Sequence, residues 1–176
     1  MDDQIYKNIT NSTAHRSSRL ANVTIILNDP TLLCDLVTLS FNTLDCNHHK
    51  ATWILEMIID TQPHLLTDHL DFFCQNINKF KNESAIRSAA KTCLHISRHL
   101  TLSSKQQNLI TENCLDWLIT TNRKVATKAY AIRTLYELGK EIRWIHPELK
   151  EILIQDYPTH SSAYKAVARE ILKKIK

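Results

Sequence analysis

Apolar residues recur every three or four positions over most of this chain, and polar segments of two to six residues interrupt them. This spacing is typical of α-helices that bury one face. It predicts one helix at 15–27, followed by helix pairs at 30–41 and 47–61, 64–80 and 83–101, 104–120 and 123–140, and 147–156 and 161–175. Residues 1–14 are polar without sustained periodicity, so we expect a loose lead-in there and a single domain at 15–176.

Proline, serine and glycine mark the predicted helix ends. Pro30, Pro63 and Pro147 each open the first helix of a pair, because the first helical position needs no N–H donor. The pair without such a proline has Ser103-Ser104, which can act as an N-cap. Gly139 ends a second helix, where we expect a left-handed C-terminal cap. It is the only glycine, which argues against hairpins, dinucleotide folds and phosphate loops and favours an all-α fold.

Four segments of the second helices align without a gap. They read Lys50-Ala51-Thr52-Trp53, Arg87-Ser88-Ala89-Ala90, Lys128-Ala129-Tyr130-Ala131 and Lys165-Ala166-Val167-Ala168. Their cations are 37, 41 and 37 residues apart, the period of a two-helix solenoid repeat. Small residues at the aligned positions let neighbouring helices pack closely, and each repeat then buries its face against the next.

The cations of these segments form the candidate binding site. If the second helices line a concave face, Lys50, Arg87, Lys128 and Lys165 form a ladder with about 10 Å between neighbours. Further cations lie within a turn of it: Lys91, Lys124 and Arg169. Such a ladder could bind a phosphate backbone or an acidic peptide. The alternative is that each cation solvates a helix start and pairs with a nearby carboxylate. A cation is disfavoured at a helix N-terminus, which favours a selected role.

Charge and cysteine content restrict the class of protein. The net charge is +4, with 12 Lys and Arg against 6 Asp and Glu at 121–176 and 10 against 12 at 1–120, so an anionic partner fits the C-terminal half better. The five cysteines include no CxxC pair and are expected to be reduced core thiols, which indicates a cytoplasmic protein. The N-terminus has no export-signal pattern and no segment is apolar enough to span a membrane.

Other candidate chemistry is sparse. His95 and His99 are four apart on one helix face and could chelate a metal, or could be two polar-face histidines; we predict no metal and no cofactor. Trp53 could stack on a base but shares its column with Ala90, Ala131 and Ala168, which indicates packing. No GxSxG and no cysteine with a predictable histidine partner occur, so we predict no catalytic residue.

The alternation of helices over residues 15–176 resembles HEAT-type and armadillo-type repeats, which implies a right-handed α-α superhelix of four to five hairpins. The C-terminal half is similar to small bacterial HEAT-like proteins sometimes labelled adenylosuccinate lyase-like. The residues that carry this similarity are Cys114-Leu115-Asp116-Trp117-Leu118, Val125-Ala126-Thr127-Lys128-Ala129-Tyr130-Ala131 and His146-Pro147-Glu148-Leu149-Lys150. Lyase chemistry is not expected, because the signature loop of that superfamily contains glycine and methionine, and this chain has one Gly and two Met.

We therefore expect a non-catalytic scaffold that binds another protein or an acidic peptide through its concave face, without membrane association. The alternative is a DNA-binding or alkylpurine-glycosylase-like protein that uses the Lys/Arg ladder. Asp116 beside Trp117 loosely resembles the acidic and aromatic residues of such glycosylase grooves. Salt-dependent binding to duplex DNA would separate these two functions.

Overall fold

The computed structural model describes residues 3–175, and within that range the chain is helical without any strand. The α-helices are α1 (Asp3–Thr10), α2 (Arg16–Asn28), α3 (Leu32–Phe41), α4 (His48–Thr61), α5 (Leu70–Asn76), α6 (Glu83–His99), α7 (Ser104–Ile119), α8 (Val125–Leu138), α9 (Ile145–Asp156) and α10 (Ser162–Leu172). Two 3-10 helices, Pro63–His69 and Ile77–Lys79, flank α5. The all-α solenoid class is confirmed.

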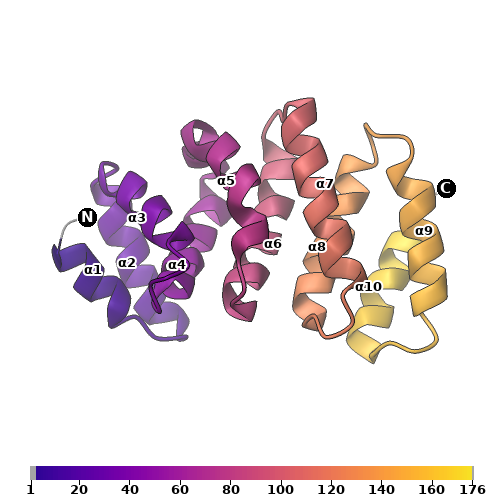
Figure 1. Ribbon diagram of the computed structural model, residues 1–176, viewed down its shortest axis with the longest axis horizontal. Helices are drawn as coiled ribbons and strands as arrows, with labels where there is room; N and C mark the ends of the chain where they lie inside the picture. Colours follow the sequence, from indigo (N-terminus) through magenta and orange to yellow (C-terminus); the bar gives the residue numbers. More distant parts are fainter. Residues whose placement is uncertain (1–2, 176) are drawn as a thin grey trace.

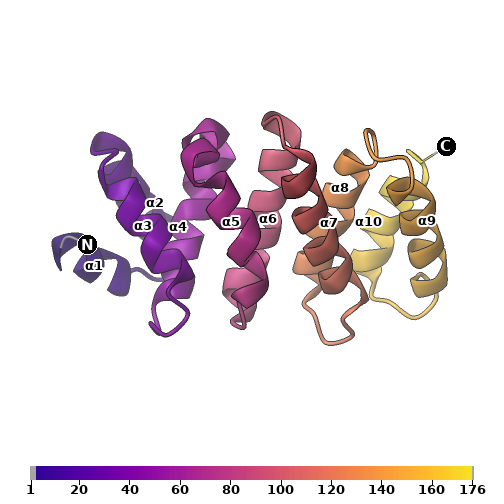
Figure 2. The ribbon, with the colours of Figure 1, turned by 45° about the horizontal axis from the view of Figure 1, so that its top comes forward.

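The helices form two layers along the length of the molecule (Figures 1 and 2). The first helices α3, α5, α7 and α9 make one layer, and the second helices α2, α4, α6, α8 and α10 make the other. Each second helix contacts the next one in the row, so this layer is continuous from α2 to α10. The two ends of the chain lie at opposite ends of the molecule (Figure 1). No helix in residues 3–175 has the length and apolarity needed to cross a bilayer.

Small residues hold the second helices together, as the repeat alignment predicts. Ala90, Ala131 and Ala168 share one column and are all 0% exposed. Leu94 and Leu135, each four residues after one of these alanines, are also buried. Because each alanine lets the adjacent helix approach closely, the core runs the length of the solenoid and is not confined to one centre.

Side chains cap the N-termini of several helices in both layers. Asn82 accepts from the backbone N–H groups of Ser84 and Ala85, at 2.9 and 3.3 Å. Ser103 forms a capping box with Gln106, which confirms the N-cap predicted there. These caps satisfy donors that have no partner inside the helix.

The N-terminal segment differs from its prediction. Residues 3–10, expected as part of a loose lead-in at 1–14, form α1, whose Ile5 and Ile9 are buried in the core. Two apolar residues are too few to reveal a helical period, although their i, i+4 spacing places both on one face. The Tyr6 hydroxyl also donates to Asp45 at 2.9 Å, which ties α1 to the α3–α4 turn. Residues 1–2 and 176 lie outside the described residues.

One predicted helix and three predicted helix ends also need correction. The single helix predicted at 64–80 is α5 with a 3-10 helix on either side. Pro147 lies inside α9, two residues after its start, and Pro30 precedes α3 by two residues. Gly139 follows α8 in a right-handed conformation, with φ −66°, and not as a left-handed cap. A glycine is needed there because a Cβ would lie 2.1 Å from Cδ2 of His146.

All five cysteines are free, three of them in the core. Cys74, Cys93 and Cys114 are buried, whereas Cys34 and Cys46 are exposed on the N-terminal repeats. Burial raises the pKa of the Cys74 thiol to about 12 and also raises that of Cys93. These two thiols remain protonated at neutral pH and therefore pack as small apolar groups.

Candidate binding groove

A groove opens on the layer of second helices between α2, α4 and α6, with a volume of about 320 Å³. We call it the N-terminal groove. Its apolar lining consists of Leu20, Val23, Leu27 and Met57. Its charged lining consists of Arg16 and Arg19 from α2, Glu56 and Asp60 from α4, and Lys91 from α6.

Glu56 is a buried carboxylate at the α4–α6 contact, with a side chain that is 4% exposed. Its Oε2 accepts from Nη2 of Arg87 and from Oγ of Ser88, both at 2.7 Å. Its Oε1 lies 3.1 Å from Nζ of Lys91. A buried charge is stable only when it is paired and hydrogen-bonded, and two cations and a hydroxyl meet that condition here.

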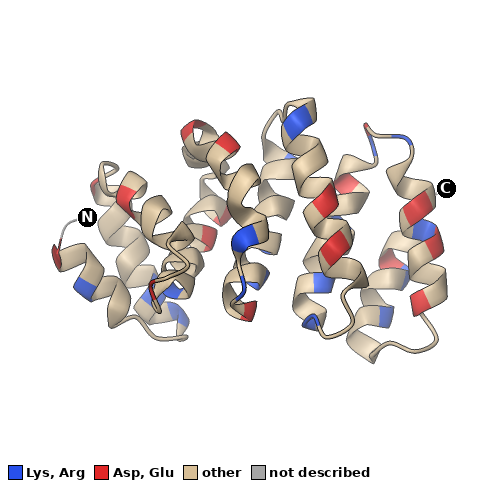
Figure 3. Cartoon of the chain, in the orientation of Figure 1, with Lys and Arg blue, Asp and Glu red and all other residues tan. Residues whose placement is uncertain are grey.

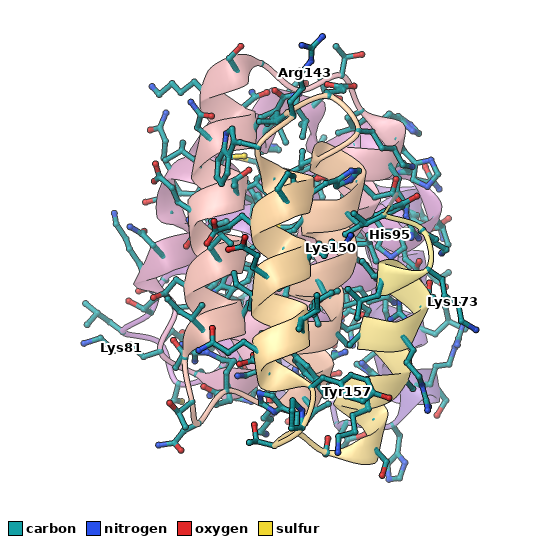
Figure 4. The ribbon with its side chains drawn as sticks, turned by 90° about the vertical axis from the view of Figure 1, so that its right-hand side faces the viewer. Lys81, His95, Arg143, Lys150, Tyr157 and Lys173 are labelled. Atoms are coloured by element: carbon teal, nitrogen blue, oxygen red, sulfur yellow. The ribbon has the colours of Figure 1, made fainter. Side chains whose placement is uncertain are left out.

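Asp60, one turn further along α4, extends this network. Nζ of Lys91 donates to Oδ2 of Asp60 at 3.0 Å. Burial acts to lower the pKa of Lys91, but Asp60 and Glu56 outweigh it and raise that pKa, so Lys91 stays charged. Nε2 of His95 lies 3.0 Å from Oδ1 of Asp60 but makes no hydrogen bond. Burial lowers the pKa of His95 against the attraction of Asp60, and nearby cations lower it further. Figure 4 shows His95 on the side of the second helices, opposite Lys81.

Pairs of arginine and glutamate join the successive second helices. The α4–α6, α6–α8 and α8–α10 contacts are bridged by Arg87 with Glu56 at 2.7 Å, Arg98 with Glu137 at 3.0 Å, and Arg133 with Glu170 at 2.8 Å. Basic and acidic residues occur together along the length of the molecule in Figure 3. The three arginines of these pairs are therefore neutralised within the protein.

The α2–α4 contact differs from the other three. Arg16 is exposed, and the guanidinium of Arg19 lies 5.9 Å from the ring centroid of Trp53. Within residues 3–175, neither arginine has an Asp or Glu at ion-pair distance, and neither side chain donates a hydrogen bond. Nε of Arg19 is buried without an acceptor. Two unneutralised cations therefore line the N-terminal groove.

The four cations of the predicted ladder have different surroundings. Nζ of Lys50 donates to the carbonyl of Thr10, the last residue of α1. Nζ of Lys165 donates to the carbonyl of Pro158 at 3.1 Å, just after α9. Arg87 binds Glu56, at the wall of the groove. Of these three cations only Arg87 pairs with a carboxylate, whereas Lys50 and Lys165 bind backbone carbonyls.

Lys128, the fourth cation, is 2% exposed. Burial lowers its pKa, while Asp156 opposes this effect and Arg123 adds to it. Of the additional cations, Lys91 lines the groove, whereas Lys124 and Arg169 are exposed. The structure thus gathers Arg87 and Lys91 at one place and leaves the others apart. Binding by the ladder remains a prediction.

The remaining candidate residues do not form a site of their own. No three His, Cys, Asp or Glu side chains within residues 3–175 are placed to hold a metal ion. Trp53 is half-buried and packs edge-on against His49, with ring centroids 5.0 Å apart. Asp116 and Trp117 belong to α7, a first helix, on the layer opposite the groove.

The repeat geometry agrees with a comparison of the sequence against known families. The model of the HEAT repeat domain matches residues 6–175. The chain belongs to this family. No curated protein and no solved structure shows a significant match. Neither this match nor the structure supports the adenylosuccinate lyase label.

Two features of this HEAT repeat domain were missed by the sequence analysis. One is the charged network at the groove. The acidic residues Glu56 and Asp60 are four apart, and the basic residues Arg87 and Lys91 have the same spacing 31 residues later. Equal spacing of opposite charges on neighbouring second helices could have revealed it. The other is the pair Arg16 and Arg19. The sequence shows them only as two cations in the first turn of α2, which by itself does not indicate a binding site.

Proposed function

We propose that this HEAT repeat domain is a non-catalytic module that binds another protein through the face of its second helices. HEAT repeats commonly mediate protein interactions, and the match covers nearly the whole chain. The observation that carries the proposal is the N-terminal groove, which combines apolar side chains with fixed charges of both signs. Protein interfaces have this composition, with apolar anchors surrounded by polar groups.

A phosphate backbone fits this face less well. Binding to a nucleic acid gains most of its affinity from cations that neutralise phosphates. Arg87 and Lys91 are held by Glu56 and Asp60, so a phosphate would have to compete with two carboxylates. The apolar side chains of the groove would gain nothing from a phosphate backbone. A partner protein would contact both the apolar and the charged side chains of the groove.

Site-specific photocrosslinking tests this function. Leu20 lines the groove and is 48% exposed, whereas Ile154 is 56% exposed on α9, a first helix at the other end of the molecule. A photoreactive phenylalanine derivative replaces each residue in turn, in cells of the source organism. We expect a discrete polypeptide to be captured at position 20 and not at 154, and the purified partner to bind the unmodified protein.

Two results would overturn the proposal. One is equal capture at both positions, or none at position 20. The other is tight binding of the purified protein to duplex DNA with an affinity that falls steeply between 50 and 200 mM salt, as phosphate contacts require.

A further inference from the structure

We infer that the N-terminal groove binds an acidic, amphipathic segment of the partner, whose carboxylates contact Arg16 and Arg19 and whose apolar side chains pack on Leu20, Leu27 and Met57. This inference rests on the proposed function and specifies the chemistry of the partner at one site.

The first argument is charge. Glu56 and Asp60 are bound by Arg87 and Lys91, so the charges on the α4–α6 side of the groove cancel. On the α2 side no carboxylate of residues 3–175 lies within ion-pair distance of an arginine. The groove therefore retains an excess of positive charge, which a carboxylate from outside would complement.

The second argument is the comparison between helix contacts. The three contacts from α4 to α10 each contain an arginine that binds a glutamate of the neighbouring helix. The α2–α4 contact has arginines and no glutamate for them in the described residues. A partner carboxylate would supply there what Glu56 supplies for Arg87 one repeat later.

The third argument is the state of Arg19. Trp53 holds its guanidinium near the ring face, at 5.9 Å from the centroid, and the buried Nε has no acceptor. An unsatisfied N–H is unfavourable, so an acceptor supplied by a partner at this guanidinium would be stabilising. Arginine binds a carboxylate through two parallel hydrogen bonds, which favours an acidic side chain over a neutral one.

The apolar surface determines the rest of the segment. Arg16, Leu20, Val23 and Leu27 follow one another at intervals of three or four residues, so they lie along one face of α2. This face runs for about 16 Å, at 1.5 Å per residue, with cations at one end and apolar side chains beyond them. An amphipathic helix with acidic residues near one end matches it, as in other cases where a helix binds in a groove.

Selection from a random-peptide display library tests the inference with a defined probe. The intact protein is immobilised, and the selected peptides are synthesised with a fluorophore for anisotropy measurements. We expect selected peptides to combine Asp or Glu with Leu, Ile, Phe or Met. Arg16→Gln/Arg19→Gln should weaken their binding about tenfold or more, since each partly exposed arginine–carboxylate contact is worth about threefold.

A matched variant controls for overall charge. Arg143→Gln/Lys150→Gln also removes two positive charges, but from exposed residues at the C-terminal end of the molecule, which Figure 4 labels. Its binding should stay within twofold of the unmodified protein. Arg16→Gln alone repeats the test without disturbing the contact between Arg19 and Trp53, and a loss of about threefold or more is expected. Leu20→Asp should also weaken binding, because it places a carboxylate on the apolar part.

The outcomes separate this inference from the proposed function. Selection of basic or uncharged peptides, or binding that is indifferent to Arg16→Gln and to the double variant, overturns the inference. If position 20 nevertheless captures a protein, the proposed function is retained and only the acidic partner segment is rejected. If position 20 captures no protein and the library yields no peptide, both fail.

Discussion

Replacing Glu56 by glutamine tests whether the buried network at the groove stabilises the N-terminal repeats. The substitution preserves the shape of the side chain and removes its charge. Glutamine keeps one oxygen for Arg87 and Ser88, but its amide N–H₂ then faces the ammonium of Lys91. The two hydrogen bonds of 2.7 Å become neutral-acceptor bonds, and the ion pair of 3.1 Å is lost.

The expected loss follows from these three contacts. A hydrogen bond to a charged group contributes about 1.5–3 kcal/mol and a neutral one about 1 kcal/mol, so each contact weakens by about 1 kcal/mol. Arg87 and Lys91 are 27% and 20% exposed, and water replaces part of what they lose. We expect the free energy of unfolding to fall by about 2–3 kcal/mol, and the melting temperature by about 4–12 °C for a domain of this size.

Urea and thermal unfolding, followed by circular dichroism, measure this loss. Glu148→Gln on α9 is the matched control, because Glu148 is exposed and has no ion pair within residues 3–175. A double-mutant cycle with Arg87→Gln isolates the pair, and a coupling of at least about 1 kcal/mol is expected for groups in direct contact. A loss below about 0.5 kcal/mol for Glu56→Gln, the range of ordinary surface substitutions, would refute the reasoning.

Three further predictions concern other parts of the fold. Gly139→Ala should destabilise by about 1–3 kcal/mol, because its Cβ would overlap the ring of His146, and should cost nothing in a His146→Ala background; thermal unfolding of the four proteins checks this. Lys128→Met should stabilise by about 1 kcal/mol in urea unfolding, because it removes a buried charge without an ion pair in the described residues. Burial lowers the pKa of both His48 and His95, so their contribution to stability is complete above the unfolded value of about 6.5 and is lost as the pH falls through the folded values. The unfolding free energy should therefore drop from pH 7 to pH 5, and less so in His48→Gln/His95→Gln; an equal drop in both proteins would contradict this.

The helical hairpins could be predicted because their signals are local. Apolar spacing and the Ser103 cap act within a few residues of the helix that they define. The packing column could also be predicted, since Ala90, Ala131 and Ala168 are small at equal offsets and prove fully buried. These features depend on the period of the repeat and not on the precise path of each first helix.

The broken helix before α6 could not be predicted from the apolar pattern. Oγ1 of Thr67 donates to the carbonyl of His64 at 2.7 Å, and Nδ2 of Asn76 donates to that of Phe72 at 2.7 Å. Side chains that bond to nearby carbonyls compete with regular helical bonding. The pattern of apolar residues is the same for an α-helix and for short 3-10 segments of similar direction, so it did not distinguish them.

The charged network was missed for a related reason. Which residues of α4 face Arg87 depends on how far the intervening segment carries the chain, and that segment is 21 residues of mixed helix type and turn between Thr61 and Glu83. The register of two neighbouring second helices is thus a tertiary property. Complementary charges could have suggested it, but only after the hairpin length was known.

The cation column illustrates how a repeated charge can belong to the fold. Lys50 binds the last carbonyl of α1, and Lys165 binds the carbonyl of Pro158 beyond the end of α9. Carbonyls at a helix C-terminus lack partners and carry partial negative charge, so they attract a lysine from an adjacent helix. This attraction offsets the unfavourable dipole at the start of the lysine's own helix. Three of the four repeating cations, Lys50, Arg87 and Lys165, are thus already bound within the chain, whereas Lys128 is buried without an ion pair in the described residues. Arg16 and Arg19 have no acceptor in the described chain, and for that reason they are the better candidates to bind a partner.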